Sequence, residues 1–304
     1  MNKKMLCLTV LMALAALGAY ARGNFDNEAG FQWELSGDGN SIIITGYTGT
    51  NTDIWIPPRI QGLPVTGIAD FAFSEEGMGD GFVEASHQFT SVIIPGTVTH
   101  IGKEAFRGSL LSSVTIPQSV TSIALGAFCS NRLCTLSVNT PHIGDWAFCC
   151  NQITSVTLGD NVSFIGEGAF FDNRLISIVI PDAVSYIGDA AFLNNELVSV
   201  ILPDSIIGIG LASFAANRLS GITIPGNVSF IGVSAFALNP LTSITIGSDV
   251  TIGESLPYFE SDIFGTSFAA FYEGMGRLAG TYLYTSGVWS KQFWGHFVGS
   301  HDAE

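Results

Sequence analysis

The feature that most constrains the fold is a six-residue segment that returns at a nearly fixed interval. The segment Ile-Gly-x-x-Ala-Phe at residues 187–192 recurs along most of the chain, and successive copies are mostly 22 residues apart. One interval is shortened to 20 residues and one is lengthened to 33. The phenylalanines that end the eight copies are Phe73, Phe106, Phe128, Phe148, Phe170, Phe192, Phe214 and Phe236. Such a period is typical of stacked repeats that share one continuous core.

Each repeat predicts a short strand followed by turns. In a typical unit, Leu175, Ile178 and Ile180 alternate with other residues as in a strand with one buried face. Pro181 ends the strand because it has no N–H to donate, and Gly188 permits the next bend. The Ala-Phe pair then turns inward. We therefore expect a repeat solenoid of coils of about 22 residues, with a parallel β-sheet on one face, short helical or 3₁₀ turns on the other, and a cap at both ends.

These units resemble the BspA-type leucine-rich repeat, a family of bacterial surface repeats built from Ile-Pro-x-x-Val-x-x-Ile-Gly-x-x-Ala-Phe units. The likeness covers roughly residues 40–253, and residues 41–73 are similar to the lead-in that opens such arrays. The chain departs from the pattern in having Ile-Ala at 68–69 and 123–124, Ser213 in place of Ala, and no Ile-Pro in the unit 128–148. The resemblance implies surface display, with adhesion to host proteins or to other bacteria in some members.

The ends of the chain predict export and capping. Lys3 and Lys4 precede an apolar run over residues 5–18 and a small-x-small site at 19–21, which is typical of a secretory signal peptide. We expect residues 1–21 to be this signal peptide, 22–66 an N-terminal cap or lead-in hairpin, 67–253 the repeats, and 254–304 an aromatic-rich C-terminal cap. No later stretch is apolar and long enough to span a membrane. The expected location is therefore extracellular or at the cell surface.

The charge balance excludes several classes of partner. The formal net charge is −15, and losing Lys3 and Lys4 with the signal peptide takes it to −17. Binding to nucleic acid or anionic lipid needs clustered positive charge, so neither is expected. Only 12% of the residues are charged, which fits a chain that hides apolar side chains along its whole length. We expect a monomer that binds a protein or glycan.

The strand residues that point away from the core form the candidate binding face. This row is Ser113, Thr115, Ser155, Thr157, Ser177, Val179, Ser199, Ile201, Thr223, Ser243 and Thr245. One interpretation is an extended docking surface for a protein or glycan. The other is that Ser and Thr simply favour exposed strands, and the sequence leaves both open. A second candidate is the insertion at 74–87, where Glu75, Glu76, Asp80 and Glu84 form an acidic recognition loop or a merely solvated one.

Two other repeat positions are chemically notable. An asparagine recurs three residues after the phenylalanine, at 131, 151, 173, 195, 217 and 239, and is expected to satisfy backbone groups at the turns. Cys129 and Cys149 occupy equivalent positions in neighbouring coils. They form either a disulfide or two buried thiols, and the sequence does not decide between them. Zinc is not expected, because no second pair of ligands completes a tetrahedral site.

The sequence contains no recognisable catalytic motif. The five histidines are interpreted as scattered over non-equivalent positions, and no nucleophile elbow, phosphate loop or metal-ligand pair is present. We therefore expect no cofactor, no metal and no catalysis. The favoured function is a secreted or surface protein that mediates protein-protein or adhesive interactions. The alternative is a structural component of the cell envelope, and a hydrolase is the least favoured.

Overall fold

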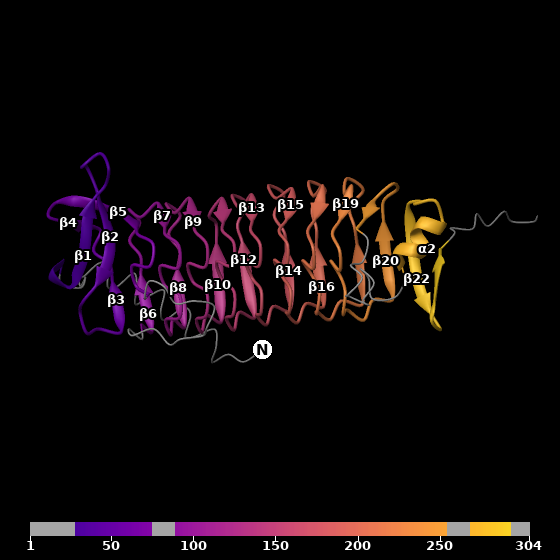
Figure 1. The fold of residues 1–304 in the computed structure, drawn as a ribbon, viewed down its shortest axis with the longest axis horizontal. Helices are drawn as coiled ribbons and strands as arrows, with labels where there is room; N and C mark the ends of the chain where they lie inside the picture. The colour runs from indigo at the N-terminus through magenta and orange to yellow at the C-terminus, as the bar shows by residue number, and fades with distance from the viewer. Residues whose placement is uncertain (1–27, 75–88, 254–267, 293–304) are drawn as a thin grey trace, which may run out of the picture.

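The chain forms an elongated solenoid whose coils stack along one axis. The computed structural model describes residues 28–74, 89–253 and 268–292. It contains about nine parallel β turns of roughly 22 residues, which confirms the predicted fold class, and Figure 1 shows the resulting rod. Over the described ranges, no helix has the length and apolar character needed to cross a membrane. The predicted signal peptide lies outside the described residues.

Each coil contributes two short strands rather than one. The first row joins into a 12-stranded sheet, the long sheet, which follows one side of the rod (Figure 1). Its coil strands are β5 (Leu63–Ile68), β7 (His100–Ile101), β9 (Ser122–Ile123), β11 (His142–Ile143), β13 (Phe164–Ile165), β15 (Tyr186–Ile187), β17 (Gly208–Ile209), β19 (Phe230–Ile231) and β21 (Thr251–Ile252). Apart from β5, these strands have only two residues each, which is too few to reveal an alternating pattern, and they were not predicted from the sequence.

The second row corresponds to the predicted Leu-x-x-Ile-x-Ile strands. It is divided into four shorter sheets, with the orders β3-β6-β8, β10-β12, β14-β16 and β18-β20-β22-β23. Its coil strands are β3 (Asp53–Trp55), β6 (Ser91–Ile93), β8 (Ser113–Thr115), β10 (Thr135–Val138), β12 (Ser155–Leu158), β14 (Ser177–Val179), β16 (Ser199–Ile201), β18 (Gly221–Thr223) and β20 (Ser243–Ile246). These strands run on the opposite side of the rod from the long sheet (Figure 1).

The Ala-Phe segments form two successive turns instead of a helix. In the coil of Phe192, the N–H of Ala191 donates to the carbonyl of Gly188 at 3.3 Å, and the N–H of Leu193 donates to that of Ala190 at 3.0 Å. Ala190 and Asn194 have positive φ angles of 52° and 59°, so the turns do not continue as a helix. Equivalent left-handed residues recur in the other coils.

Hydrogen bonds between these turns all run in one direction. The N–H groups of Ala190, Phe192 and Asn194 donate to carbonyls of the next coil, at 2.7, 2.8 and 3.1 Å. The same direction holds in the neighbouring coils, where for example the N–H of Phe170 donates to the carbonyl of Ala191. Each turn therefore presents donors toward the C-terminal end of the rod and acceptors toward the N-terminal end.

A stack of phenylalanine rings forms the centre of the core. The eight repeated phenylalanines stack nearly parallel, with centroids 4.7 to 5.6 Å apart. From Phe106 to Phe236 these rings have no solvent-exposed area. The strand isoleucines, valines and leucines surround the stack in one continuous buried cluster. No coil could bury its own phenylalanine alone, so the coils stabilise one another.

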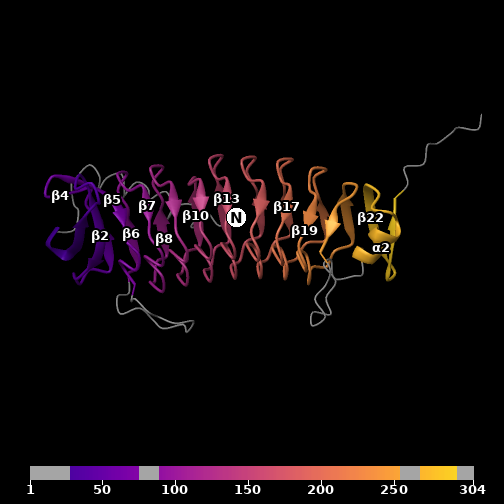
Figure 2. The ribbon, with the colours of Figure 1, turned by 45° about the horizontal axis from the view of Figure 1, so that its top comes forward.

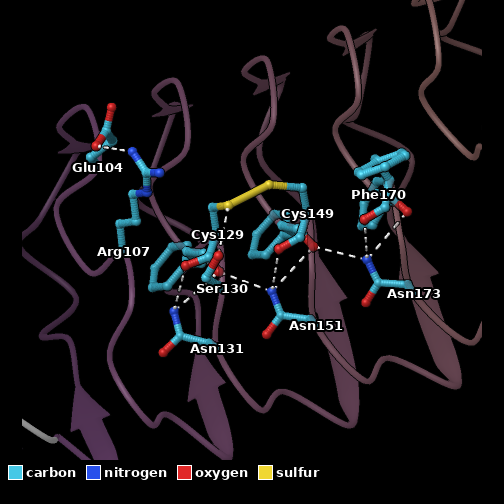
Figure 3. Close-up of a disulfide and its surroundings, with 12 residues drawn as sticks. Glu104, Arg107, Cys129, Ser130, Asn131, Cys149, Asn151, Phe170 and Asn173 are labelled. Carbon is cyan, nitrogen blue, oxygen red and sulfur yellow. Dashed lines mark hydrogen bonds and ion pairs between the residues drawn. A yellow bond between two sulfur atoms is a disulfide. The ribbon is translucent and has the colours of Figure 1, made fainter. Parts of the chain in front are cut away.

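The asparagine ladder closes the turn beside the phenylalanines. The Nδ2 of Asn195 donates to the carbonyl of Phe192 in its own coil and of Phe170 in the preceding coil, at 3.2 and 2.9 Å. Its Oδ1 accepts the N–H of Leu175 at 3.0 Å. All six asparagines are buried and repeat these contacts, as Figure 3 shows for Asn131, Asn151 and Asn173. The predicted structural role of this position is confirmed.

Antiparallel strands flank the stack at both ends. At the N-terminal end, β1 (Phe31–Leu35) pairs with β2 (Ile42–Tyr47), next to a short 3₁₀ helix η1 (Glu28–Gly30), and β4 (Arg59–Ile60) pairs with β5. At the C-terminal end, β22 (Gly280–Thr285) pairs antiparallel with both β20 and β23 (Val288–Lys291). The helix α2 (Phe268–Gly274) lies beside this hairpin (Figure 2). This hairpin lies within the segment 254–304 that the sequence predicts to be a C-terminal cap.

Candidate binding surfaces

The predicted binding face lies on the second row of strands. Its side chains are exposed over most of its length, namely at Thr115, Ser155, Thr157, Ser177, Val179, Ser199, Ile201 and Thr223. The ends of the row are partly buried, at Ser113, Ser243 and Thr245. The hydroxyl of Thr245 lies 3.0 Å from that of Thr281 on β22, so the C-terminal hairpin covers this end. The accessible part of the face therefore extends from β8 to β18.

An aliphatic patch occupies the middle of this face. Val179 and Ile201 are 59% and 60% exposed, and Ile176 and Val198, just before β14 and β16, are 51% and 53% exposed. Val179 lies opposite Ile201 in the parallel pair, and the N–H of Val198 donates to the carbonyl of Ile176 at 2.9 Å, so each pair lies on neighbouring coils. The sequence analysis counted Val179 and Ile201 within the row but did not identify Ile176 and Val198. Together these four residues form the aliphatic patch, and hydroxyl side chains border it.

The long sheet presents a second surface, which the sequence analysis missed. Except at the buried glycines Gly67 and Gly208, the side chain that precedes each buried isoleucine is at least partly exposed. Strand pairing places these positions side by side from β5 to β21. Four of them form the aromatic row: His142, Phe164, Tyr186 and Phe230. His100 belongs to the same register, so two histidines are equivalent and the interpretation of all five as non-equivalent is wrong. Aligning the repeats on Ile-Gly would have revealed the row.

The rings of the aromatic row lie close together. The His142 and Phe164 rings stack at 4.4 Å between centroids and 6° between planes. The Tyr186 ring occupies the space directly above Gly208, because a Cβ built on Gly208 would lie 2.9 Å from a Tyr186 ring carbon. Gly208 has no side chain and therefore leaves room for the Tyr186 ring on the Phe230 side. The four rings thus lie along the consecutive strands from β11 to β19, with Gly208 between Tyr186 and Phe230.

Six carboxylates lie within four residues of this register in the sequence. Asp145, Glu167 and Asp189 follow it by three residues, and Asp160, Asp182 and Asp204 precede it by four. The Oδ1 atoms of Asp145 and Asp189 accept backbone N–H groups of the next coil. The hydroxyl of Tyr186 lies 3.5 Å from Oδ1 of Asp189. Burial, and then the charge of Asp189, raise the pKa of the Tyr186 phenol above its ordinary value. Among the described residues, none of the six carboxylates takes part in an ion pair.

The cysteine positions lie on a third side, next to the asparagine ladder. Cys129 and Cys149 are joined in a disulfide with Cα atoms 4.8 Å apart, which Figure 3 shows bridging two neighbouring coils. Cys150 is a free thiol, and burial followed by the charge of Asp172 raises its pKa. The three sulfur atoms lie within 4.8 Å of one another and are the one such metal-ligand group in the described part of the chain. Since two of the sulfurs are bonded to each other, the group offers a single protonated thiol.

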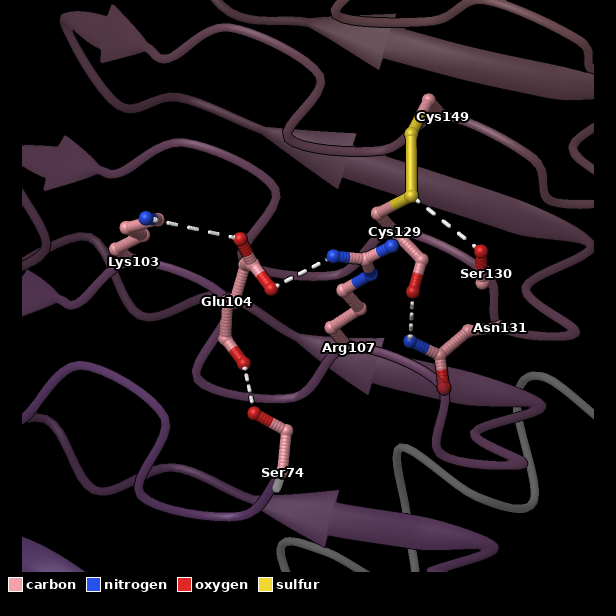
Figure 4. A network of polar contacts seen from close by, with 8 residues as sticks. All are labelled: Ser74, Lys103, Glu104, Arg107, Cys129, Ser130, Asn131 and Cys149. Atoms are coloured by element: carbon pink, nitrogen blue, oxygen red, sulfur yellow. Dashed lines mark hydrogen bonds and ion pairs between the residues drawn. A yellow bond between two sulfur atoms is a disulfide. The ribbon is translucent and has the colours of Figure 1, made fainter. Parts of the chain in front are cut away.

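A small polar network adjoins the disulfide (Figure 4). The guanidinium of Arg107 donates to Glu104 at 2.8 Å, and Lys103 lies 3.9 Å from the same carboxylate. The hydroxyl of Ser74 donates to the backbone carbonyl of Glu104 at 2.6 Å. These contacts hold the coil that precedes the disulfide, and they converge on no open site. The network is therefore structural.

The remaining candidate residues give no catalytic arrangement among the described residues. The acidic loop residues Glu75, Glu76, Asp80 and Glu84 lie outside the described ranges. A shallow hollow near the N-terminal end is lined by residues 29–30 and 47–51, which include no acid, histidine or cysteine. His100 and His142 are exposed on the long sheet, away from the cysteines. The geometry favours recognition by surfaces.

Comparison with known families identifies the repeats. A family model described as the BspA type leucine-rich repeat region, in six copies, matches residues 79–196 and 141–263. Together these matches cover more than half of the chain. Among curated proteins, none matches the sequence significantly.

Solved structures of bacterial leucine-rich repeat proteins are similar to this chain. One from Bacteroides ovatus has 22% identity and a TM-score of 0.52, covering 74% of this chain and 66% of the other. A leucine-rich cell surface protein from Faecalibacterium prausnitzii has 24% identity and a TM-score of 0.46, covering 74% of this chain and 76% of the other. A leucine-rich repeat protein from T. pallidum has 26% identity and a TM-score of 0.47, covering 71% of this chain and 89% of the other. At these identities the first likeness supports the fold alone.

Proposed function

Because the chain belongs to the BspA-type leucine-rich repeat family, we propose that it is an exported, non-catalytic scaffold that binds other proteins at the cell surface. The aliphatic patch carries this proposal. Soluble proteins rarely expose contiguous apolar side chains unless these contact a partner, and interfaces combine an apolar centre with a polar rim. Ile176, Val179, Val198 and Ile201 supply the centre, and the Ser and Thr side chains of the face supply the rim.

Rigidity supports the same proposal. The patch lies on paired strands whose inward residues, including Ile178 at 2% exposure, belong to the buried core. A preformed surface loses little conformational entropy on binding, which favours affinity even for a modest contact area. The face contains no tryptophan, tyrosine or arginine anchors, so we expect individual contacts to be weak and several coils to act together.

Binding assays with matched variants test the proposal. The exported chain is immobilised and exposed to extracellular-matrix proteins, glycans and bacterial surface preparations at micromolar concentrations. Replacing Val179 and Ile201 with Thr should weaken protein binding, and the fold should tolerate this change because Thr157 and Thr223 already occupy the equivalent positions. Arginine at Ser155, Ser177 and Ser199 should block it completely.

A matched control separates this face from the long sheet. The same three-arginine change at Ser163, Ser185 and Ser229, which are exposed beside the long sheet, should leave binding to the aliphatic patch intact. Absence of any ligand at micromolar concentrations would contradict the binding scaffold. It would favour a structural role in the cell envelope, which fractionation of cells would then locate.

A further inference from the structure

We propose that the aromatic row of the long sheet binds an extended, arginine-rich segment of a partner protein. This surface lies on the opposite row of strands from the aliphatic patch. It therefore adds a second site and a second ligand chemistry to the function proposed above. Three observations carry the inference: the exposure of the rings, their places on consecutive strands, and the acidic character of this part of the chain.

The aromatic side chains are not required by the core. Phe164, Tyr186 and Phe230 are 41%, 43% and 41% exposed, whereas the isoleucine that follows each of them is at most 1% exposed. The same register position is occupied by Ser122 and Thr251 in other coils, where the strand pairing is unchanged. The fold therefore tolerates small polar residues at this position. The exposed rings are not needed for packing, which indicates a role outside the core.

The rings offer faces and edges over several consecutive coils. His142 and Phe164 stack on each other, and Tyr186 lies over Gly208 toward Phe230. Because the Tyr186 ring covers a position that has no side chain, its outer surface remains open at 43% exposure. Four strand spacings of about 4.8 Å separate β11 from β19, so the row spans roughly 19 Å, the length of about six extended residues.

The charge around the row selects a cationic ligand. Residues 139–249 contain nine Asp and Glu but only two Lys and Arg. Both of these are arginines that follow the asparagine ladder on another side of the coil, and Arg218 is paired with Glu196 at 3.1 Å. Six of the nine acids lie within four residues of the register of the rings, and Asp189 lies 3.5 Å from the Tyr186 hydroxyl. A basic partner is therefore electrostatically complementary to this face, and an anionic one is repelled.

Arginine fits this combination better than lysine. Its guanidinium is planar, so it stacks on an aromatic face while its edge donates hydrogen bonds to carboxylates. An extended backbone with arginine at every second position would place its guanidinium groups along the row. A lysine ammonium has the same charge but cannot stack and donate in a fork at the same time.

Peptide binding measured by fluorescence anisotropy tests the proposal. The probe is a labelled peptide of about twelve residues that alternates arginine and serine, long enough to cover the row. Peptides with lysine or glutamine in place of arginine serve as controls. We expect the arginine peptide to bind the exported chain most tightly, the lysine peptide several-fold more weakly, and the glutamine peptide not at all. Equal affinity for the arginine and lysine peptides would overturn the proposal, because it would indicate general attraction to an acidic protein.

Variants of the row separate the rings from the charge. Phe164→Ser with Tyr186→Ser keeps the net charge and introduces a residue that the row already contains at Ser122. We expect about tenfold weaker binding of the arginine peptide from the loss of two ring contacts. Unchanged affinity would refute the assignment. Asp182→Asn with Asp189→Asn keeps the rings, and should weaken binding several-fold and reduce its salt dependence.

Two further outcomes keep this proposal distinct from the function proposed above. Val179→Thr with Ile201→Thr, on the opposite face, should leave peptide binding unchanged; a matching loss would show that the peptide is not bound at the aromatic row. Binding of neutral oligosaccharides that is lost in the Phe164→Ser, Tyr186→Ser variant, with no peptide binding, would assign the row to glycans and overturn the inference. Melting curves by circular dichroism establish that each variant is folded before it is compared.

Discussion

The buried asparagine ladder allows the cost of one substitution to be worked out in detail. In Asn195→Ala, four hydrogen bonds are removed. The Nδ2 group loses its bonds to the carbonyls of Phe170, Phe192 and Leu193, at 2.9, 3.2 and 3.4 Å. The Oδ1 atom no longer accepts the N–H of Leu175, which it accepts at 3.0 Å.

The asparagines of neighbouring coils share carbonyl acceptors, so the three carbonyls each keep another donor when Asn195 is replaced. The first two carbonyls also accept from the side chains of Asn173 and Asn217, at 3.2 and 2.9 Å, and the third accepts from the N–H of Asp172 at 3.0 Å. The N–H of Leu175 has no such second partner among the contacts of the described residues. One buried donor is therefore left without an acceptor.

An orphaned buried N–H costs about 1–3 kcal/mol, and the weakened carbonyl contacts add about 1 kcal/mol. We therefore expect Asn195→Ala to lower the free energy of unfolding by about 2–4 kcal/mol, measured by urea denaturation followed by circular dichroism. The control is Asn161→Ala, at an exposed turn, which should change stability by no more than about 0.5 kcal/mol. A result for Asn195→Ala as small as the control would refute the reasoning.

The charge of the same position gives a pH-dependent test. In Asn195→Asp, the carboxyl lies among backbone carbonyl oxygens, which disfavour its ionised form and raise its folded-state pKa above the unfolded value of about 3.9. Below that value both states are protonated, and the acid can still donate one hydrogen bond. The destabilisation relative to the wild type should therefore be smallest near pH 3.5 and should grow as the pH rises toward 7. Destabilisation that does not change with pH would contradict this account.

Further predictions concern the turns, the aromatic row and the disulfide. Gly188→Ala should unfold the repeats or cost several kcal/mol, because its Cβ would lie 2.6 Å from the backbone of the preceding coil, whereas Gly226→Ala, with no atom within 4 Å, should be nearly neutral in urea denaturation. Asp189→Asn should lower the pKa of the Tyr186 phenol in a spectrophotometric titration; no change would show that the carboxylate does not reach the ring. Since that pKa is raised on folding, stability should fall as the pH rises through and above about 10. Cys129→Ser should cost about 3 kcal/mol in oxidising buffer only, and an equal loss under reducing conditions would argue against the disulfide.

The repeat architecture was predictable because its signals are long and redundant. The phenylalanine at 192 and the asparagine at 195 each recur at the interval of the coil, so their shared burial and stacking follow from spacing alone. Pro181 also recurs at the interval of the coil in several repeats, and it therefore marks the end of the second-row strand. A departure from the consensus at a single position, such as Ser213 before Phe214, does not obscure the pattern, because the neighbouring repeats contain the same signal.

The long sheet and its aromatic row were less accessible to sequence reasoning. Strands such as β15 contain two residues, and a single outward residue next to one inward residue has no measurable period. The outward position also varies in chemistry, from Ser122 to Tyr186 and Gly208, so composition does not identify it. An alignment of the repeats on Ile-Gly, or the register that pairs Tyr186 with Gly208, is needed to show that these unlike residues form one surface.

The one-way hydrogen bonding of the phenylalanine turns makes the rod polar along its axis. A stack cut between two coils would expose turn amides, such as that of Ala190, and strand carbonyls, such as that of Ile187, at its C-terminal end. Its N-terminal end would expose the reverse set, so the two ends fit each other. Two stacks without end strands would therefore associate head to tail. A head-to-tail contact repeats without closing, as in a fibre. The strands β1 and β23 run antiparallel to their neighbours β2 and β22 and interrupt this continuation. These end strands therefore limit the length of the stack, because nothing within the repeated coils prevents the addition of a further coil.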